Sequence, residues 1–373
     1  MRIKLFQNII DLIRGKGDNT LSYRPCKKVF IPKEYTPPKH TYKHLISIQG
    51  VTGHSGSSAF FDLLSEYENV TPFGIYDPHG SCCKNASYGE IDFLRRYGGV
   101  FDLESAFSSK NSNIRDFKLK NFITLLEYSF THNDFYNKKI IELTYEFIDS
   151  LVDFKLKTDT GCDENLAFIF KKGFKSDYAN LRTPYLFEHK KDRYLYYLKN
   201  ITPDEYVKLA REYIIKCFNT IESKDYLVLD AVLGEGSADF EKLEKYVGEY
   251  KIISSMRDPR DVYTAGFIVP CSNWVPHNPR DFVKWYKFHG LPYINGKHKN
   301  YKLVRFEDLI LNYDKTVAEI TEFLGLDESL HKHKKQYLNP EVSIKNVGTH
   351  KKCPDQEGVE YIHQELKEYC YEI

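Results

Sequence analysis

The stretch from His44 to Tyr67 constrains the fold more than any other part of the sequence. An apolar run, His44–Gln49, leads into a turn, Gly50–Ser58, and then into an amphipathic run. A strand, a glycine-rich turn and a helix in this order predict an anion cradle, because small residues let the backbone come close and free helix N–H groups point outward. A tight turn needed only for chain reversal is the alternative. The glycines and hydroxyl residues of the turn are Gly50, Gly53, Gly56, Thr52, Ser55, Ser57 and Ser58.

Further apolar runs with the length of strands follow along the chain, at Tyr226–Asp230, Lys251–Met256 and Tyr301–Arg305. Helical patterns separate them, and strands that alternate with helices indicate a parallel sheet covered on both faces. We therefore expect an α/β fold of three layers. Its central sheet should be mostly parallel and should carry a P-loop-like phosphate-binding turn.

Between about residues 87 and 223 the pattern changes to segments rich in Tyr, Phe and Lys at helical spacing, including Phe117–Phe130, Lys138–Phe154 and Pro203–Ile221. The strand pattern resumes afterwards, so we predict a helical insertion within a single domain, residues 44–373. Its aromatic side chains either form an acceptor wall or, for most of them, pack a core. Residues 1–43 should form an amphipathic segment and a proline-rich connector.

The charges nearly cancel, with 53 Lys and Arg against 52 Asp and Glu. No global positive field exists to hold nucleic acid, so an anionic ligand needs a local cluster.

The eight cysteines show no zinc-type spacing, which favours reduced thiols in a cytoplasmic protein without a metal site. The first residues lack the apolar run of a signal peptide or membrane span. We favour an ordinary packed helix there over weak contact with a membrane surface or a partner.

The order of residues in the turn excludes a Walker A loop, which requires a lysine before the hydroxyl residue, whereas Ser57 follows Gly56 directly. The basic residue comes earlier, in His54-Ser55-Gly56-Ser57-Ser58. This order resembles the 5′-phosphosulfate loop of the sulfotransferases, which is a lysine or arginine followed by Ser-Gly-Thr/Ser-Thr/Ser.

A second resemblance lies in KIISSMRDPRDVYTA, Lys251–Ala265, an apolar strand followed by Arg-Asp-Pro-Arg-Asp and a helix. It is similar to the 3′-phosphate-binding motif of the same family, which implies that Arg257 binds a phosphate. A capped turn with exposed charges is the alternative. Ala265 stands where the family has a serine, and Thr264 is the candidate substitute.

Two later segments extend the resemblance. Tyr301–Leu326 resembles the strand and helix of the family that end in Phe-Leu-Gly, and we interpret it mostly as scaffold. Ser343–Lys352, SIKNVGTHKK, resembles a basic loop that closes over the donor's phosphates. Lys351 and Lys352 are the candidates there, with a solvated run of charges as the alternative.

The resemblance implies the donor 3′-phosphoadenosine 5′-phosphosulfate and transfer of its sulfuryl group to an acceptor hydroxyl, with no metal. His54 would stabilise the leaving phosphate if protonated, or else only pack while a cation such as Lys84 arrives. Asp230 and Asp77 are candidates for the base, with His79 and Glu235 as further ones. The expected donor-binding residues are Thr52, Gly53, His54, Ser55, Gly56, Ser57, Ser58, Arg257, Thr264, Lys351 and Lys352.

We expect the acceptor to be a carbohydrate or glycan, because the resemblance is closer to the Arg-Asp-Pro-Arg-Asp branches of the family. Two other classes remain open. A catalytically silent module that binds a nucleotide or glycan would fit His54 and Ala265, whereas a P-loop nucleotide kinase is disfavoured by the missing Walker lysine.

Overall fold

The computed structural model describes residues 24–25, 41–73, 99–110, 114–115, 117–119, 121–122, 138–157, 194–230, 238–269, 272 and 274–372. Within these ranges, no helix combines the length and the apolar character needed to cross a bilayer.

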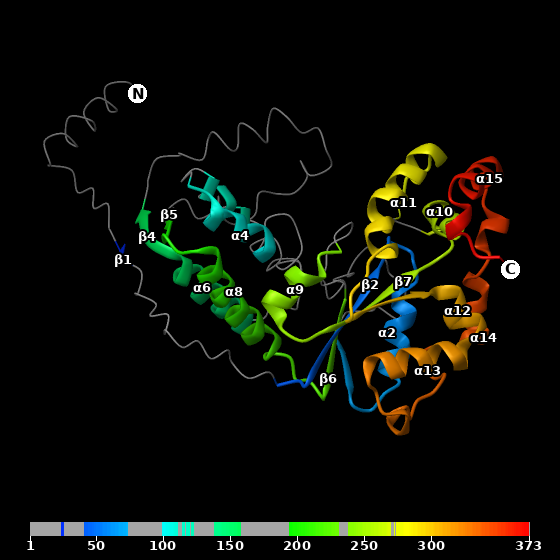
Figure 1. The fold of residues 1–373 in the computed structure, drawn as a ribbon, viewed down its shortest axis with the longest axis horizontal. Helices are drawn as coiled ribbons and strands as arrows, with labels where there is room; N and C mark the ends of the chain where they lie inside the picture. Colours follow the sequence, from blue (N-terminus) through cyan, green and yellow to red (C-terminus); the bar gives the residue numbers. More distant parts are fainter. Residues whose placement is uncertain are drawn as a thin grey trace, which may run out of the picture.

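In the described part of the chain, the central sheet has five strands in the order β3-β6-β2-β7-β8, and every neighbouring pair is parallel. Figure 1 shows this sheet in the middle of the molecule. All four strands expected from the sequence are present, which confirms the predicted parallel α/β fold. The bounds are Val70–Phe73 for β3, Tyr226–Asp230 for β6, His44–Gly50 for β2, Lys251–Met256 for β7 and Tyr301–Arg305 for β8.

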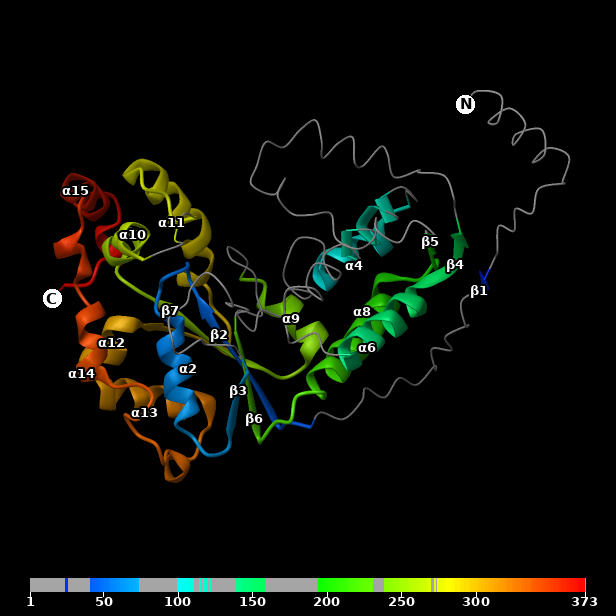
Figure 2. The same ribbon diagram turned by 180° about the vertical axis from the view of Figure 1, so that it is seen from behind.

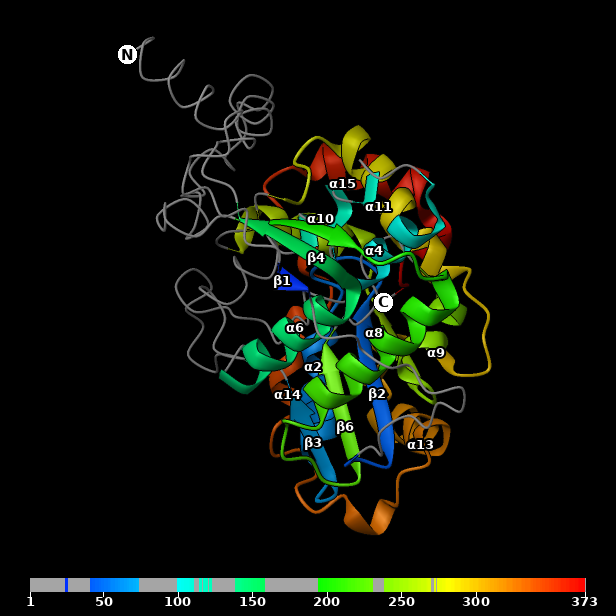
Figure 3. The same ribbon diagram turned by 90° about the vertical axis from the view of Figure 1, so that its left-hand side faces the viewer.

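Alternating side chains of each strand enter two separate cores. Ile46 and Ile48 of β2 belong to one buried cluster, whereas Leu45 belongs to the other. The first cluster packs under α2 (Ser57–Ser65), α12 (Phe306–Leu311) and α13 (Tyr313–Leu324). The second packs under α4 (Val100–Ser108), α6 (Lys138–Leu151), α8 (Pro203–Phe218) and α9 (Phe240–Val247), and Figure 3 shows α6 and α8 in front of the sheet. Helices on both faces make the three predicted layers.

A third group of helices lies beyond the carboxyl ends of β2 and β7 (Figure 1). It contains α10 (Pro259–Ile268), α11 (Pro279–Ile294) and α15 (Gln356–Glu365), and it has its own buried cluster around Tyr263, Phe282 and Tyr286. The remaining short elements are η2 (Glu328–Leu330), α14 (Pro340–Ser343), η3 (Ile344–Asn346), η4 (Thr349–Lys352) and η5 (Lys367–Tyr369).

The segment predicted as a helical insertion contains helices and also two strands, β4 and β5, which pair with each other. Strand β1, from the segment predicted as a proline-rich connector, pairs with β4, so the three form a small antiparallel sheet in the order β1-β4-β5. The predicted helix over Lys138–Phe154 is too long: α6 ends at Leu151, and β4 begins at the next residue and pairs with β5. Of Phe117–Phe130, only residues 117–119 and 121–122 are described, as helix. Figure 2 shows the described helices α4, α6 and α8 and the strands β4 and β5 on the opposite side of the molecule from α12 and α13. The strands are Arg24–Pro25 for β1, Val152–Lys157 for β4 and Tyr194–Leu198 for β5.

The predicted helix over Pro203–Ile221 is confirmed as α8, although it ends at Phe218. Its start has a full capping box, in which the Thr202 hydroxyl accepts from the Glu205 amide and the Glu205 carboxylate accepts from the Thr202 amide. Pro203 stands at the first helical position, where its missing N–H costs nothing. Local sequence therefore defines the beginning of this helix.

Candidate functional site

The turn Gly50–Ser58, called the glycine turn below, lies beside the Arg-Asp-Pro-Arg-Asp motif. Strands β2 and β7 are parallel, and their register pairs Gly50 with Ser255. The Ser255 hydroxyl donates to the carbonyl of Ser55. The glycine turn and Arg257, which follows β7, are therefore neighbours at the edge where parallel sheets bind ligands.

Two hydroxyl groups predicted to contact the donor are used inside the glycine turn. Ser55 Oγ donates to the carbonyl of Thr52 at 2.5 Å, and Thr52 Oγ1 donates to the carbonyl of Gly53 at 3.2 Å. Both side chains are almost fully buried. In this conformation they hold the shape of the turn, and a contact with a phosphate would require them to leave these carbonyls.

A side chain at any glycine of the turn would collide with the protein itself. A Cβ at Gly50 would lie 2.6 Å from backbone of the turn, and one at Gly53 would lie 1.7 Å from the Trp274 ring. At Gly56 it would lie 2.6 Å from the Phe306 ring, and the φ of 88° there is strained for other residues. Internal packing thus explains why these three positions are glycine. From the sequence alone, the same glycines are explained by the close approach of an anion.

The N-terminus of α2 has free capacity for an anion. Gly56 is its N-cap residue, no side chain among the described residues caps it, and its first turn contains no acidic residue. By contrast, α10 and α11 are capped by the side chains of Asp258 and Asn278. Ser57 is half-buried and Ser58 is exposed at the start of α2. Uncapped N–H groups and the helix dipole favour a negative group at this point.

His54 is held by two contacts from the segment that follows α10. Its Nε2 lies 2.8 Å from the Ser272 hydroxyl, and its ring stacks on Trp274 with centroids 4.8 Å apart and planes 14° apart. Burial, and then the nearby charge of Arg257, lowers the pKa of His54 to about 4. The imidazole is therefore neutral at pH 7 in this structure. The positive charge on His54 that the sequence prediction requires would have to be induced by the bound anion.

The Arg257 guanidinium connects three segments that the sequence singles out. It donates to the carbonyl of His54 at 3.3 Å, to the carbonyl of Asn346, and to the Thr349 hydroxyl at 3.4 Å. Its side chain is 12% exposed, and its Nε is buried and has no hydrogen bond within the part of the chain that the structure describes. Burial lowers the pKa of this group, and nearby acidic groups, Asp261 first, oppose the change. A buried cation with an unused donor is suited to an anionic ligand.

Asp261, the last residue of the Arg-Asp-Pro-Arg-Asp motif, holds the C-terminal loop predicted to lie over the donor. Its carboxylate accepts from the amides of Gly348 and His350, at 2.8 Å each, and lies 2.7 Å from His350 Nδ1. Burial raises its pKa, but hydrogen bonding from His350 and the charge of Arg257 outweigh burial and lower it overall. Lys351 and Lys352 follow in η4, and both are exposed.

Thr264 is fully buried, and its hydroxyl donates to the Arg260 carbonyl at 2.7 Å, within α10. This bond satisfies the hydroxyl inside its own helix. Ala265 is also buried. A donor contact at Thr264 would need an exposed hydroxyl, so the predicted replacement of the family's serine has no counterpart in this conformation.

The candidates for the general base lie mostly outside the described residues. Asp230 ends β6, and its backbone pairs with Ile48 of β2, next to the start of the glycine turn. Its side chain lies outside the described part, as do the other candidates for the base, Asp77, His79 and Glu235. Lys84, the alternative cation for the leaving phosphate, also lies outside it. The backbone position of Asp230 agrees with the edge of the sheet at which a base is expected.

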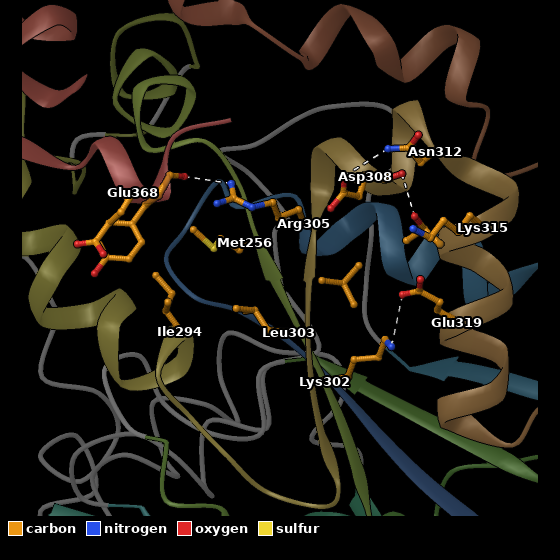
Figure 4. A pocket seen from close by; sticks show the side chains of 13 residues that line it. Met256, Ile294, Lys302, Leu303, Arg305, Asp308, Asn312, Lys315, Glu319 and Glu368 are labelled. Carbon is orange, nitrogen blue, oxygen red and sulfur yellow. Dashed lines mark hydrogen bonds and ion pairs between the residues drawn. The ribbon is translucent and has the colours of Figure 1, made fainter. Parts of the chain in front are cut away.

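Figure 4 shows a cavity of about 490 Å³ at the outer side of β8. Its wall carries charges of both signs, which come from Lys302, Arg305, Asp308, Lys315 and Glu319. Neither the glycine turn nor Arg257 lines it. This cavity is thus separate from the candidate donor site.

Within the described ranges, no group of three or more His, Cys, Asp and Glu side chains could hold a metal ion. The described cysteines Cys217, Cys353 and Cys370 are free thiols. Burial raises the pKa of Cys370 to about 12, which keeps it protonated and unreactive.

Several residues of the site were not predicted from the sequence. The sequence does contain an indication for Ser255, because a serine within an otherwise apolar strand suggests that its hydroxyl forms a specific hydrogen bond. Trp274 is one of only two tryptophans in the chain, but its distance from the glycine turn along the sequence hides their contact. Glu307 resembles any acidic residue in a first helical turn, although it is fully buried.

No protein-family model and no curated protein matches this chain. Among solved structures, the chain is similar to the sulfotransferase domain of the olefin synthase from Synechococcus PCC 7002. That match has 13% identity and a TM-score of 0.35, over 91% of this chain and 100% of that one. Sulfotransferase STF9 from Mycobacterium avium matches at 12% identity and a TM-score of 0.34, over 88% of this chain and 76% of that one.

Proposed function

We propose that this chain is a sulfotransferase that uses 3′-phosphoadenosine 5′-phosphosulfate as its donor. The observation that carries the proposal is the position of Arg257. Its guanidinium joins the glycine turn, through His54, to the C-terminal loop, through Asn346 and Thr349. Three segments that separately resemble sulfotransferase motifs thus meet at one buried cation.

The residues present fit a donor that carries two phosphate groups. The uncapped N-terminus of α2 would hold the 5′-phosphate, which becomes the leaving group. Arg257 would bind the 3′-phosphate through its guanidinium, and the exposed Lys351 and Lys352 would add positive charge nearby. Two separate anion-binding features are needed by a 3′,5′-bisphosphate and not by ATP, which has a single phosphate chain.

In the proposed reaction, the acceptor oxygen forms a bond to sulfur while the bond from sulfur to the 5′-phosphate oxygen breaks. The acceptor proton passes to a base, for which Asp230 and Asp77 are the candidates, and adenosine 3′,5′-bisphosphate leaves. The protein's task is to position the reactants and to stabilise the charge on the leaving phosphate. We propose a carbohydrate hydroxyl as the acceptor, on the strength of the Arg-Asp-Pro-Arg-Asp resemblance.

A catalytically silent nucleotide-binding module is the second candidate, and the neutral His54 favours it. With its pKa lowered to about 4, the imidazole has no positive charge for the leaving group before a ligand binds. Such a module would bind the donor and transfer nothing.

Calorimetric titration with adenosine 3′,5′-bisphosphate and with ATP tests the donor. We expect the bisphosphate to bind more tightly, and tighter binding of ATP would exclude the proposal. Transfer of ³⁵S from labelled donor to a panel of sugars, phenols and lipids then separates enzyme from module. Labelled sugar supports the sulfotransferase and its acceptor, whereas donor binding without any labelled product supports the silent module.

A further inference from the structure

The junction of β8 and α12 contacts both halves of the proposed donor site. The Phe306 ring lies against Gly56, at the N-terminus of α2. The same ring lies beneath the Arg257 guanidinium, with the central carbon 5.4 Å from its centroid. One aromatic side chain therefore sets the spacing between the feature proposed for the 5′-phosphate and the cation proposed for the 3′-phosphate.

The next residue, Glu307, fixes the backbone beside Arg257. Its Oε1 accepts from the Asp258 amide at 2.8 Å, so it orients the peptide group that joins Arg257 to Asp258. Glu307 has no exposed surface, and its second oxygen, Oε2, is buried without a hydrogen bond to any of the described residues. A buried carboxyl group with one unused oxygen is costly to keep for packing alone.

Asp258 in turn starts the helix that follows. Its side chain caps α10 by accepting from the Arg260 amide, and it forms a close ion pair with the Arg260 guanidinium at 2.6 Å. It also accepts from the Tyr371 amide at 2.9 Å. Because these bonds fix the Asp258 side chain while Glu307 fixes its amide, the backbone that carries Arg257 has little freedom.

We propose that Glu307 is a positioning residue that holds Arg257 in place for the 3′-phosphate of the donor. This inference rests on the proposed function, and it assigns a task to a segment that the sequence suggests is mostly scaffold. Glu307 acts through the Asp258 amide and does not touch the donor. Its loss should therefore weaken recognition of the 3′-phosphate and leave recognition of the 5′-phosphate unchanged.

The test compares two nucleotides that differ only in the 3′-phosphate, adenosine 3′,5′-bisphosphate and adenosine 5′-monophosphate. Their dissociation constants are measured by calorimetry for the wild type, Glu307→Ala and Glu307→Gln. We expect Glu307→Ala to weaken bisphosphate binding about tenfold, the size of one well-placed hydrogen bond to a charged group, and monophosphate binding less than twofold. Glu307→Gln keeps an oxygen for the Asp258 amide, so it should restore most of the lost affinity.

Glu66 offers a matched control. It is also fully buried, and its carboxylate also accepts backbone amides, those of Tyr337 and Leu338, at 3.1 and 2.9 Å. These amides belong to the loop before α14, whose bonds are not shared with Arg257 or Asp258. Glu66→Ala should therefore lower thermal stability as Glu307→Ala does, without changing the ratio of the two dissociation constants.

The outcomes separate the positioning role from the proposed function. If Glu307→Ala weakens the binding of both nucleotides equally, the ratio of their dissociation constants stays unchanged, and this result would overturn the positioning role alone. A wild type that does not prefer the bisphosphate would overturn the donor assignment and the positioning role with it. As a further check, Glu307→Ala should have no effect on the ratio in an Arg257→Ala background, and a persisting effect would show that Glu307 acts by another route.

Discussion

Replacing Glu307 with glutamine should change how the stability of this protein depends on pH. Burial raises the pKa of the Glu307 carboxyl from 4.5 to about 7, and the hydrogen bond from the Asp258 amide offsets only part of the effect. Between these two values the folded protein keeps a proton that the unfolded chain has lost. The free energy of unfolding therefore falls as the pH rises from 4.5 to 7, and the loss is complete above pH 7.

The size of this effect follows from the two pKa values. One pKa unit corresponds to about 1.4 kcal/mol, so the wild type should lose about 2.5 kcal/mol from this group between pH 5 and pH 8. Glutamine has nearly the same shape and cannot ionise. Its buried NH₂ group costs about 1–3 kcal/mol at every pH if it finds no acceptor. The stability of Glu307→Gln relative to the wild type should thus improve by about 2.5 kcal/mol from pH 5 to pH 8.

Urea unfolding of both proteins at several pH values between 5 and 8, followed by circular dichroism, measures this difference. Other titrating groups are common to both proteins, so they cancel in the comparison. A difference in unfolding free energy that stays constant with pH would mean that Glu307 does not titrate in this range. A difference that moves in the opposite direction would mean that Glu307 is stabilised as an anion, and either result would refute the reasoning.

Three further predictions concern the glycine turn and its neighbours. Arg257→Ala should weaken binding of adenosine 3′,5′-bisphosphate about 30- to 100-fold, the value of one or two hydrogen bonds to a charged group, as measured by calorimetry. Gly53→Ala should destabilise the protein by about 1–3 kcal/mol, because its Cβ would lie 1.7 Å from Trp274, and the tryptophan fluorescence should change with it. In NMR titrations the His54 imidazole should show a pKa near 4 without ligand, and adding the bisphosphate should raise it, whereas an unchanged value would exclude ion pairing with the leaving phosphate.

The central strands could be predicted because of where they lie. A parallel strand buried on both faces is rich in Ile, Leu and Val, and β2, β6 and β7 all contain such residues in short runs. The end of α6 could not be predicted in the same way. The sequence from Val152 onward fits a helix or a strand, and its pairing with Leu198, far along the chain, decides the outcome.

Only part of the site could be predicted from the sequence, again because contacts between distant parts of the chain decide the rest. Motif order placed the glycine turn and Arg257 at one edge of the sheet, and strand register brings them together. The directions of side chains depend on contacts from elsewhere in the fold. The Thr52 and Ser55 hydroxyls turn inward onto carbonyl groups, and the stacking of Trp274 on His54 joins residues that no local pattern connects.

The charge balance around Arg257 explains how a site with a neutral histidine can attract an anion. In this structure the guanidinium donates to the uncharged carbonyls of His54 and Asn346, while the carboxylate of Asp261 lies farther away, at 3.8 Å. A phosphate is a much stronger acceptor than a carbonyl oxygen, so it gains more from the same cation. A bound phosphate would also neutralise the charge of Arg257, which after burial is the second cause of the low pKa of His54. Binding at Arg257 should therefore favour protonation at His54, and the two proposed phosphate sites would be coupled through one short contact.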